Sequence, residues 1–449
     1  MTSSVRAAAQ PRSHFGSLAR LGIVSCIVEG LRVLIRLLKM VAFANILGPE
    51  ARGVLSLVNL IPELIVTIGN MGFGQGVLYY VAKEKYPVRR AMGGTLLFLL
   101  IAGAFLAAAG YGVLHIDMLL KGQSGVIRQY GWAIVLAIPV FLAYKVGELF
   151  LTSLAQIRTI NKTKLVESFL PLALFLLLIP VMGSPLDAAV WSWFVSLGLV
   201  CALIYLFLAK QGTFPPQRDW NFFRLGVRYG MASYFTQFFM LALNRMDYLF
   251  ISAMLGAEDL GVYAISTSMA EILYILPASF AIPFIPILFG MDKEDAEHFT
   301  PMVIKLGLII MSMAALCVYL LGRPVLQTFF SPGYLPAYEP LVLLLPGVIS
   351  FSLFPFLRYD VFRRNRPGLV SGLTGMALLV NLILNYLWIP RYGIAGAAMS
   401  SSISYTLSTC ILLLIYCRLS GKRVHQVLFL SRSEAATILR YVRKRLLRR

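Results

Sequence analysis

Apolar runs long enough to cross a lipid bilayer recur along the whole chain. A membrane-spanning helix needs roughly 20 consecutive residues that are mostly apolar, and the sequence contains twelve runs of this kind, separated by polar stretches. We expect spans at residues 21–47, 54–81, 91–114, 130–153, 165–182, 188–209, 227–255, 262–289, 302–321, 341–357, 369–389 and 394–416. The pattern predicts an all-α, polytopic membrane protein with twelve transmembrane helices.

Composition supports this prediction and argues against a soluble fold. Of the 449 residues, 59% are hydrophobic and 13% are charged, whereas a soluble domain carries about 25% charged residues. Residues 1–20, MTSSVRAAAQPRSHFGSLAR, are polar and basic and contain no apolar core. We therefore expect no cleavable signal peptide.

The net charge of +20 is explained by membrane topology and does not require a nucleic-acid partner. If the N-terminus is cytoplasmic and the spans alternate in direction, most of the 40 Lys and Arg residues fall in cytoplasmic loops and in the C-terminal tail. The positive-inside rule describes this distribution. We expect a multi-pass membrane protein with both termini cytoplasmic.

An internal repeat divides the chain into two halves. The stretch LGPEARGVLSLVNLIPEL, from Leu47, matches LGAEDLGVYAISTSMAEIL, from Leu255, at an offset of 208 residues. The alignment pairs Gly and Glu residues as well as apolar ones, and each half holds six expected spans. Two homologous lobes with an even number of spans are related by an axis along the membrane normal. We expect an N-terminal segment 1–20, an N-lobe 21–209, a cytoplasmic linker 210–226, a C-lobe 227–417 and a basic tail 418–449, with a central cavity between the lobes.

The second span of each lobe contains residues that interrupt helices. The first lobe has Gly69 and Gly72 there, and the second has Pro277 and Pro283. Interruptions at corresponding places in two halves are typical of a transporter's central binding site. The alternative is close helix packing through small residues.

The first span carries four charged residues on one side of a helix. Glu29, Arg32, Arg36 and Lys39 fall within an arc of about 80° at 100° per residue. A charge at the bilayer centre costs about 2.5–3.5 kcal/mol on insertion scales, so such residues usually face the bundle interior. The excess of positive charge favours an anionic substrate. Two alternatives are ion pairs with the carboxylates of Glu63, Glu148 or Asp247, and an amphipathic helix lying on the membrane surface.

Other charged residues within the spans add candidates for binding and ion coupling. Lys145 and Glu148 are three residues apart and are expected to pair with each other, while Arg245 and Asp247 lie in the seventh span. The candidates for substrate binding are Arg32, Arg36, Lys39, Lys145 and Arg245. The candidates for coupling to a proton or sodium ion are Glu29, Glu148 and Asp247.

The chain shows no sign of catalytic or cofactor chemistry. Its Cys and His residues fit no metal-ligand spacing, no glycine-rich nucleotide loop is present, and no catalytic cluster lies at a loop mouth. We expect neither an enzyme nor a resident metal or cofactor. The tail sequence SEAATILRYVRKRLLRR predicts a helix on anionic lipid, or else a frayed tail that only sets topology.

Three stretches resemble the polysaccharide-transporter branch of the multidrug/oligosaccharidyl-lipid/polysaccharide exporter superfamily. They are NRMDYLFISAMLGAEDLGVYAIS, its repeat partner LGPEARGVLSLVN, and NLILNYLWIPRYGIAGAAMSSSISY. The resemblance covers residues 21–417. It implies two six-helix bundles around a cavity that opens to one side of the membrane at a time.

Members of the Wzx type in this branch flip oligosaccharides linked to undecaprenyl diphosphate, and the resemblance implies the same substrate class here. A polysaccharide polymerase and chain-length machinery are implied as partners in O-antigen or exopolysaccharide export. The alternatives are a multidrug exporter of the same fold, whose cationic substrates Arg32, Arg36 and Lys39 would repel, and a peptidoglycan-precursor flippase. A non-transporting scaffold and a membrane-embedded transferase fit the sequence less well.

Overall fold

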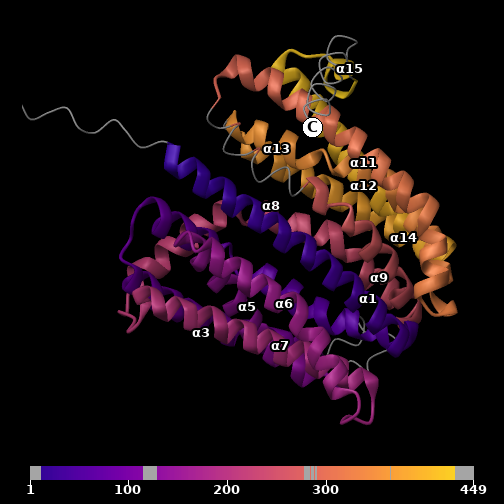
Figure 1. Cartoon of the computed structure of the whole chain (residues 1–449), viewed down its shortest axis with the longest axis horizontal. Helices are drawn as coiled ribbons and strands as arrows, with labels where there is room; N and C mark the ends of the chain where they lie inside the picture. The colour runs from indigo at the N-terminus through magenta and orange to yellow at the C-terminus, as the bar shows by residue number, and fades with distance from the viewer. Residues whose placement is uncertain are drawn as a thin grey trace, which may run out of the picture. The chain divides into compact units, whose positions relative to one another are not determined.

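The computed structural model describes residues 12–114, 129–277, 284, 288, 291–364 and 366–429, with no β-strand in these ranges. The basic tail prediction falls on residues 430–449 for its larger part and lies outside the described residues, as does Pro283. Contacts within the chain define two compact units (Figure 1). Unit 1 consists of Met1–Leu47 and Val54–Tyr234, and unit 2 consists of Gly48–Gly53 and Phe235–Arg449.

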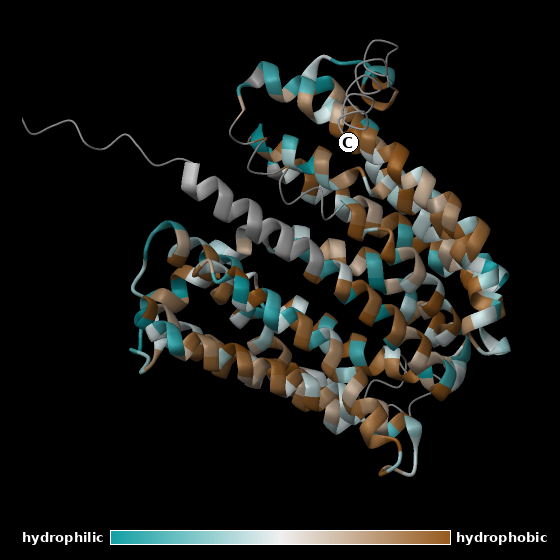
Figure 2. Ribbon diagram, in the orientation of Figure 1, coloured by the Kyte–Doolittle hydropathy of each residue, from teal (hydrophilic) through white to brown (hydrophobic). Residues whose placement is uncertain are grey.

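Unit 1 is built from long helices that pack around α5. Its helices are α1 (Arg12–Gly69) apart from Gly48–Gly53, α2 (Phe73–Leu78), the π-helix η1 (Tyr79–Lys83), α3 (Val88–Val113), α5 (Gly131–Ser153), α6 (Ile157–Leu178), α7 (Pro185–Leu208), the π-helix η2 (Ala209–Thr213) and the first part of α8 (Trp220–Met254). Both α3 and α7 pack along α5, and α6 packs along α7. Figure 2 shows hydrophobic residues along most of α3 and α7, as expected for helices that face lipid or an apolar core.

Unit 2 has a core formed mainly by α12 and α14. Besides the second part of α8, it contains α9 (Ala257–Ile272), α11 (Lys293–Phe329), the 3-10 helix η3 (Pro332–Ala337), α12 (Tyr338–Phe351), α13 (Phe354–Arg363), α14 (Pro367–Ser420) and α15 (Val424–Leu428). The contacts of α12 with α14 are extensive. A cluster of buried Phe, Leu, Val and Tyr side chains fills the space between α11, α12, α13 and α14.

Eight helices in the described ranges are long and apolar enough to cross a membrane. Two of them, within α1 and α14, are long enough for two spans each, since the backbone departs from helical geometry at Gly48 (φ 73°) and Gly393 (φ 59°). The expected linker 210–226 is mostly helical: η2 extends to Thr213 and α8 begins at Trp220. The chain is an all-α, polytopic membrane protein.

Equivalent corners of the sequence repeat contact each other within unit 2. Gly48 and Gly256, which the repeat aligns, both adopt a positive φ with ψ near 180°, a conformation that glycine alone takes readily. A Cβ added to Gly53 would overlap the carbonyl oxygen of Ala257, and one added to Gly261 would overlap that of Pro49. This contact is reciprocal, because the offset of 208 residues relates Pro49 to Ala257 and Gly53 to Gly261.

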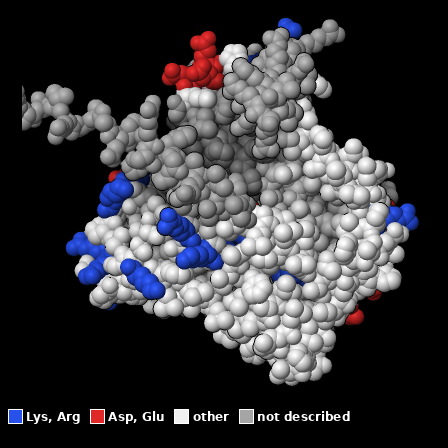
Figure 3. All heavy atoms as spheres, in the orientation of Figure 1, with Lys and Arg blue, Asp and Glu red and all other residues white. Residues whose placement is uncertain are grey.

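Basic side chains gather at one end of unit 1. On the face shown in Figure 3, Lys and Arg residues cluster at the end of unit 1 where the loops after η1, α5 and α7 lie. Hydrogen bonds join these loops: Arg89 Nε donates to Gly212 O (3.3 Å) and Gln156 Nε2 donates to Gln211 Oε1 (3.1 Å). Unit 1 therefore has a basic end on the face shown.

Candidate functional site

The charged stretch of α1 contains one arginine that is buried and paired. Arg32 is only 8% exposed, and its Nη1 lies 2.6 Å from the Glu29 carboxylate one turn away. Its Nε donates to Ser168 Oγ on α6 (3.2 Å). Since a buried charge is tolerated when it is paired and hydrogen-bonded, Arg32 and Glu29 hold α1 against α6 and leave little of the Arg32 charge for a ligand.

Arg36 differs from Arg32 although it lies one helical turn further along the same face. On this face Met40 and Phe43 are buried, while Leu34 and Leu38 on the opposite face are 58% and 63% exposed. The Arg36 side chain is nevertheless exposed, and no hydrogen bond or ion pair is made by it within the described residues. Arg36 thus projects into open space on the packed side of α1. Lys39, another predicted substrate-binding residue, is half-buried and interacts with another part of the protein.

Polar side chains of α1, α5 and α6 form a polar seam, which consists of Glu29, Arg32, Glu148, Lys164 and Ser168. Glu148 on α5 pairs with Lys164 on α6 (Oε1–Nζ 3.2 Å), so the expected pairing of Glu148 with Lys145 is wrong. Lys145 is instead exposed, with its Nζ 5.2 Å from the centre of the Phe141 ring. The reason is geometric, because α6 packs close enough to α5 to supply a cation that the sequence spacing alone does not reveal.

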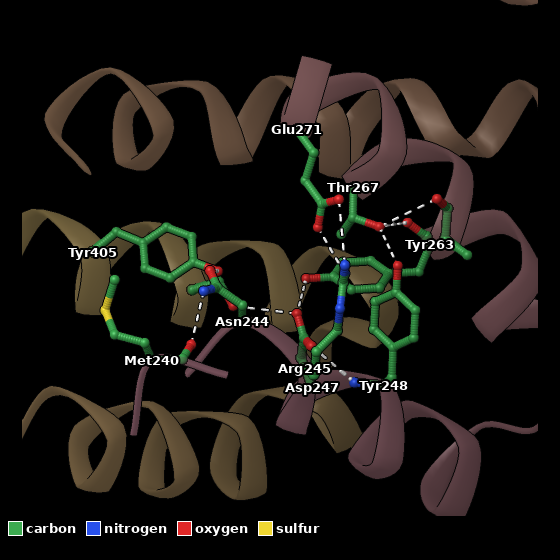
Figure 4. A network of polar contacts seen from close by, with 11 residues as sticks. Met240, Asn244, Arg245, Asp247, Tyr248, Tyr263, Thr267, Glu271 and Tyr405 are labelled. Atoms are coloured by element: carbon green, nitrogen blue, oxygen red, sulfur yellow. Dashed lines mark hydrogen bonds and ion pairs between the residues drawn. The ribbon is translucent and has the colours of Figure 1, made fainter. Parts of the chain in front are cut away.

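Unit 2 places the predicted substrate-binding residue Arg245 in an ion pair. Its Nη1 and Nη2 lie 2.7 and 3.4 Å from the two carboxylate oxygens of Glu271 (Figure 4). The pair joins α8 to α9, and Glu271 is the repeat partner of Glu63. A bidentate pair of this kind positions both side chains, and it satisfies the guanidinium without a ligand.

Asp247 is the buried centre of a hydrogen-bond network in unit 2. It is 1% exposed and accepts hydrogen bonds from the Tyr248 backbone N–H (2.9 Å), the Tyr263 hydroxyl (2.6 Å) and the Ser401 hydroxyl (3.4 Å). Asn381 donates to Ser401 in turn (3.3 Å). All of these donors are neutral, and the network joins α8 and α9 to both parts of α14 (Figure 4 shows its α8 and α9 side).

Sequence reasoning identified Asp247 but missed its partners. Tyr263, Ser401 and Asn381 are far from Asp247 in the sequence and belong to types that often occur in helices for packing. The spaced asparagines and the serine run of NLILNYLWIPRYGIAGAAMSSSISY were a usable signal. Polar residues at that density within apolar helices usually face one another.

The repeat shows that the two units carry different chemistry at equivalent positions. The offset of 208 residues aligns Arg36 with Asn244 and Lys39 with Asp247. Unit 1 therefore has cations where unit 2 has a neutral amide and a carboxylate. In unit 2 the amide is engaged, since Asn244 accepts a hydrogen bond from the Tyr405 hydroxyl (2.9 Å).

The predicted breaks have different surroundings in the two units. In unit 1, α1 ends at Gly69, and Gly72 follows with φ 67°, its N–H bonded to the Asn70 side chain (2.6 Å). Gly72 packs against the backbone of Gly230 on α8, which leaves no room for a Cβ. In unit 2, α9 ends at Ile272, and Pro277 lies buried five residues later. Close packing therefore accounts for the glycine at position 72.

The described residues contain no group of three or more His, Cys, Asp or Glu side chains that could hold a metal ion. The polar side chains that the structure brings together are instead hydrogen-bonded or ion-paired groups inside long apolar helices. A fold of this kind, with a polar seam in one unit and a buried carboxylate network in the other, belongs to the helical membrane transport proteins.

Comparison with known proteins identifies the family. Residues 42–339, more than half of the chain, match the family model described as "Polysaccharide biosynthesis protein". The chain belongs to this family, in the polysaccharide-transporter branch of the multidrug/oligosaccharidyl-lipid/polysaccharide exporter superfamily. The resemblance that the sequence motifs indicated is confirmed.

One curated relative and two solved structures extend the comparison. The chain is 21% identical over 381 residues to the probable low-salt glycan biosynthesis flippase Agl15 of Haloferax volcanii, covering 82% of this chain and 77% of the relative. An inward-facing multidrug resistance transporter of the MATE family has the same fold, with a TM-score of 0.73, 14% identity and coverage of 89% and 98%. The lipid II flippase MurJ gives 0.72, 12% identity and coverage of 90% and 89%.

Proposed function

We propose that the protein flips an oligosaccharide linked to undecaprenyl diphosphate from the inner to the outer leaflet of the cytoplasmic membrane. Membership of the polysaccharide biosynthesis family and the similarity to a glycan flippase support this substrate class. The structural observation that carries the proposal is the exposed Arg36 on the packed side of α1. A multidrug exporter shares the fold, but the cations Arg36, Lys39 and Lys145 disfavour the cationic compounds that such exporters usually expel.

The anionic diphosphate of the substrate matches the cationic side chains of unit 1. The head group is too polar to cross hydrocarbon unaided, and its diphosphate remains anionic at the membrane surface. Arg36 offers a permanently charged planar fork for phosphate oxygens, whereas Lys39 and Lys145 offer point charges. In this proposal Arg36 is the principal diphosphate ligand, Lys39 and Lys145 assist, and Arg32 and Arg245 position the helices through their ion pairs.

The topology follows from the same proposal. The non-helical residues Gly48 and Gly393 divide α1 and α14 into two spans each, which raises the eight candidate spans to ten. The helices α6 (22 residues) and α8 (35 residues) bring the proposed number to twelve. The basic end of unit 1 lies in the cytoplasm under the positive-inside rule, and both termini lie there as well. The protein resides in the bacterial inner membrane, where a polysaccharide polymerase and chain-length machinery receive the flipped unit. The two lobes alternate access to a central cavity.

Asp247 is the group that couples transport to an ion gradient in this proposal. Burying an ionised carboxylate whose hydrogen-bond donors are all neutral costs free energy. Binding of a proton or sodium ion removes that cost and so stabilises the conformation in which Asp247 is buried. Glu29 and Glu148, the other two candidates, already face cations at 2.6 and 3.2 Å. Their charges are compensated within unit 1 without a transported ion.

Replacement of Asp247 by Asn is expected to abolish the response of flipping to an imposed proton or sodium gradient. The amide keeps the side-chain shape but has no charge to exchange a cation. The measurement is the flipping rate of a lipid-linked oligosaccharide in proteoliposomes, with and without each gradient. Glu148→Gln serves as the control and should leave the gradient response intact. A gradient response in Asp247→Asn equal to that of the unmodified protein would refute the coupling role.

The proposed function itself is tested by lipid analysis of a strain that lacks the protein. The lipid-linked oligosaccharide should accumulate in the inner leaflet, while the polysaccharide is lost from the cell surface. Accumulation should be reversed by the intact gene. If no lipid-linked intermediate accumulates, and the strain instead becomes sensitive to amphipathic cations, the protein is a drug exporter and the proposal is wrong.

A further inference from the structure

Three tyrosines form an aromatic platform in unit 1, in which Tyr229 is exposed and Tyr79 and Tyr80 are half-buried. The rings of Tyr79 on η1 and Tyr229 on α8 are stacked, with centroids 4.2 Å apart and planes 21° apart. Tyr80 meets both rings edge-on, at 5.2 Å from Tyr79 and 5.9 Å from Tyr229. Tyr229 is 37% exposed, whereas an aromatic side chain that only packs between helices would be buried. We call Tyr79, Tyr80 and Tyr229 the tyrosine platform.

The hydroxyls of the tyrosine platform differ from those of other tyrosines in unit 1. Tyr86 and Tyr130 donate to the carboxylates of Asp219 and Asp187, and Tyr205 and Tyr234 donate to backbone carbonyls. Within the described part of the chain, none of the three platform hydroxyls takes part in a hydrogen bond, and none is a buried unsatisfied atom. The described chain therefore leaves the three platform hydroxyls without a hydrogen-bond partner.

The backbone that precedes the platform is closely packed. Gly72 and Gly76 lie against the backbone of Gly230 and Gly226, which brings α2 and α8 into direct contact just before the platform begins. The platform then starts at η1, a five-residue π-helix, and short π-helical insertions are frequent at functional sites. A closely packed support of this kind lowers the entropic cost of binding a ligand on the rings.

A cation completes the arrangement. The Lys83 Nζ lies 5.0 Å from the centre of the Tyr79 ring, within cation–π range. Lys83 is exposed and belongs to the last turn of η1, next to the basic end of unit 1. The platform thus combines flat apolar rings, unused hydroxyl groups and a positive charge on one surface.

We propose that the tyrosine platform is a subsite for a sugar ring of the lipid-linked oligosaccharide. A pyranose has an apolar face of C–H groups and a rim of hydroxyls, and tyrosine combines a flat apolar ring with a polar tip. The sugar face stacks on the exposed ring of Tyr229, which Tyr79 supports from behind, the hydroxyls bond to the sugar's rim, and Lys83 attracts acidic substituents. The inference rests on the proposed flippase function and adds to it a site that reads the sugar, separate from the diphosphate ligand Arg36.

The test compares two lipids with the full-length protein in nanodiscs. The probes are undecaprenyl diphosphate, and undecaprenyl diphosphate that carries a single N-acetylglucosamine. The unmodified protein should bind the sugar-bearing lipid about tenfold more tightly, as expected for a few stacking and hydroxyl contacts. The variant Tyr79→Ala/Tyr229→Ala should bind the two lipids equally. Tyr79→Phe/Tyr229→Phe keeps the rings and should retain part of the preference.

A matched control is available at the far ends of α5 and α7. Trp132 and Trp191 are similarly exposed, with ring centroids 4.8 Å apart. Trp132→Ala/Trp191→Ala should keep the preference for the sugar-bearing lipid. Loss of the preference in this control, its persistence in Tyr79→Ala/Tyr229→Ala, or its absence from the unmodified protein would overturn the sugar subsite alone. Failure of the unmodified protein to bind either lipid would overturn the flippase function as well.

Discussion

Replacement of Arg36 by Glu is expected to abolish flipping of the lipid-linked oligosaccharide without preventing membrane insertion. Arg36 is exposed on the packed side of α1, so the protein does not need its charge to fold. A carboxylate at the same place would repel the diphosphate in every conformation that exposes it. The measurement is the flipping rate in proteoliposomes, normalised to the amount of correctly folded protein.

Smaller changes at Arg36 separate charge from geometry. Arg36→Lys should keep part of the activity, because it retains the charge but loses the bidentate fork. Arg36→Ala should weaken binding of undecaprenyl diphosphate by roughly 1.5–3 kcal/mol, the value of a hydrogen bond to a charged group, and should leave binding of undecaprenol unchanged. Normal transport by folded Arg36→Ala and Arg36→Glu variants would exclude Arg36 from the substrate site.

Arg32 provides the matched control for Arg36, since it is one turn away on the same helix. Its side chain is buried between Glu29 and Ser168. Arg32→Ala should leave the Glu29 charge without its cation and should therefore lower thermal stability. The selectivity of the remaining folded protein for diphosphate over an uncharged lipid should be preserved. The two variants thus distinguish a structural arginine from a ligand-binding arginine.

Gly261→Ala is expected to prevent stable folding, although it adds a single methyl group. The new Cβ would overlap the carbonyl oxygen of Pro49, and the clash is with backbone, which cannot rotate away. Overpacking of a well-packed site costs about 1–3 kcal/mol, and more when the backbone must move. Gly53→Ala should have the same effect, because the contact with Ala257 is reciprocal.

Thermal stability in detergent, followed by size-exclusion chromatography, measures this effect. Gly198→Ala on α7 is the control, because no heavy atom lies within 4 Å of a Cβ placed there. This variant should have the melting temperature of the unmodified protein or a slightly higher one. A Gly261→Ala protein as stable as Gly198→Ala would show that the two corners of the repeat do not pack together as described.

The sequence by itself determined the class of the protein and its internal symmetry. Spans of about 20 apolar residues have no stable alternative to helix inside a bilayer, because every backbone N–H and C=O must be bonded within the segment. The repeat was visible since glycine at positions such as Gly48 and Gly256 is required by a backbone conformation that other residues avoid. The family followed from the same local motifs, and none of these features depends on which helices become neighbours.

The tertiary structure decided which charged residues are free and which are paired. Helical periodicity places Arg32 and Arg36 on one face and so treats them alike, but α6 supplies Ser168 to the first and nothing in the described chain to the second. Glu148 pairs with Lys164 of α6 rather than with Lys145. Asp247 obtains Ser401 from α14, a residue 154 positions away. The physical reason is that a charge within a membrane is stabilised by whichever polar group lies within about 3–4 Å, and that distance is set by helix packing.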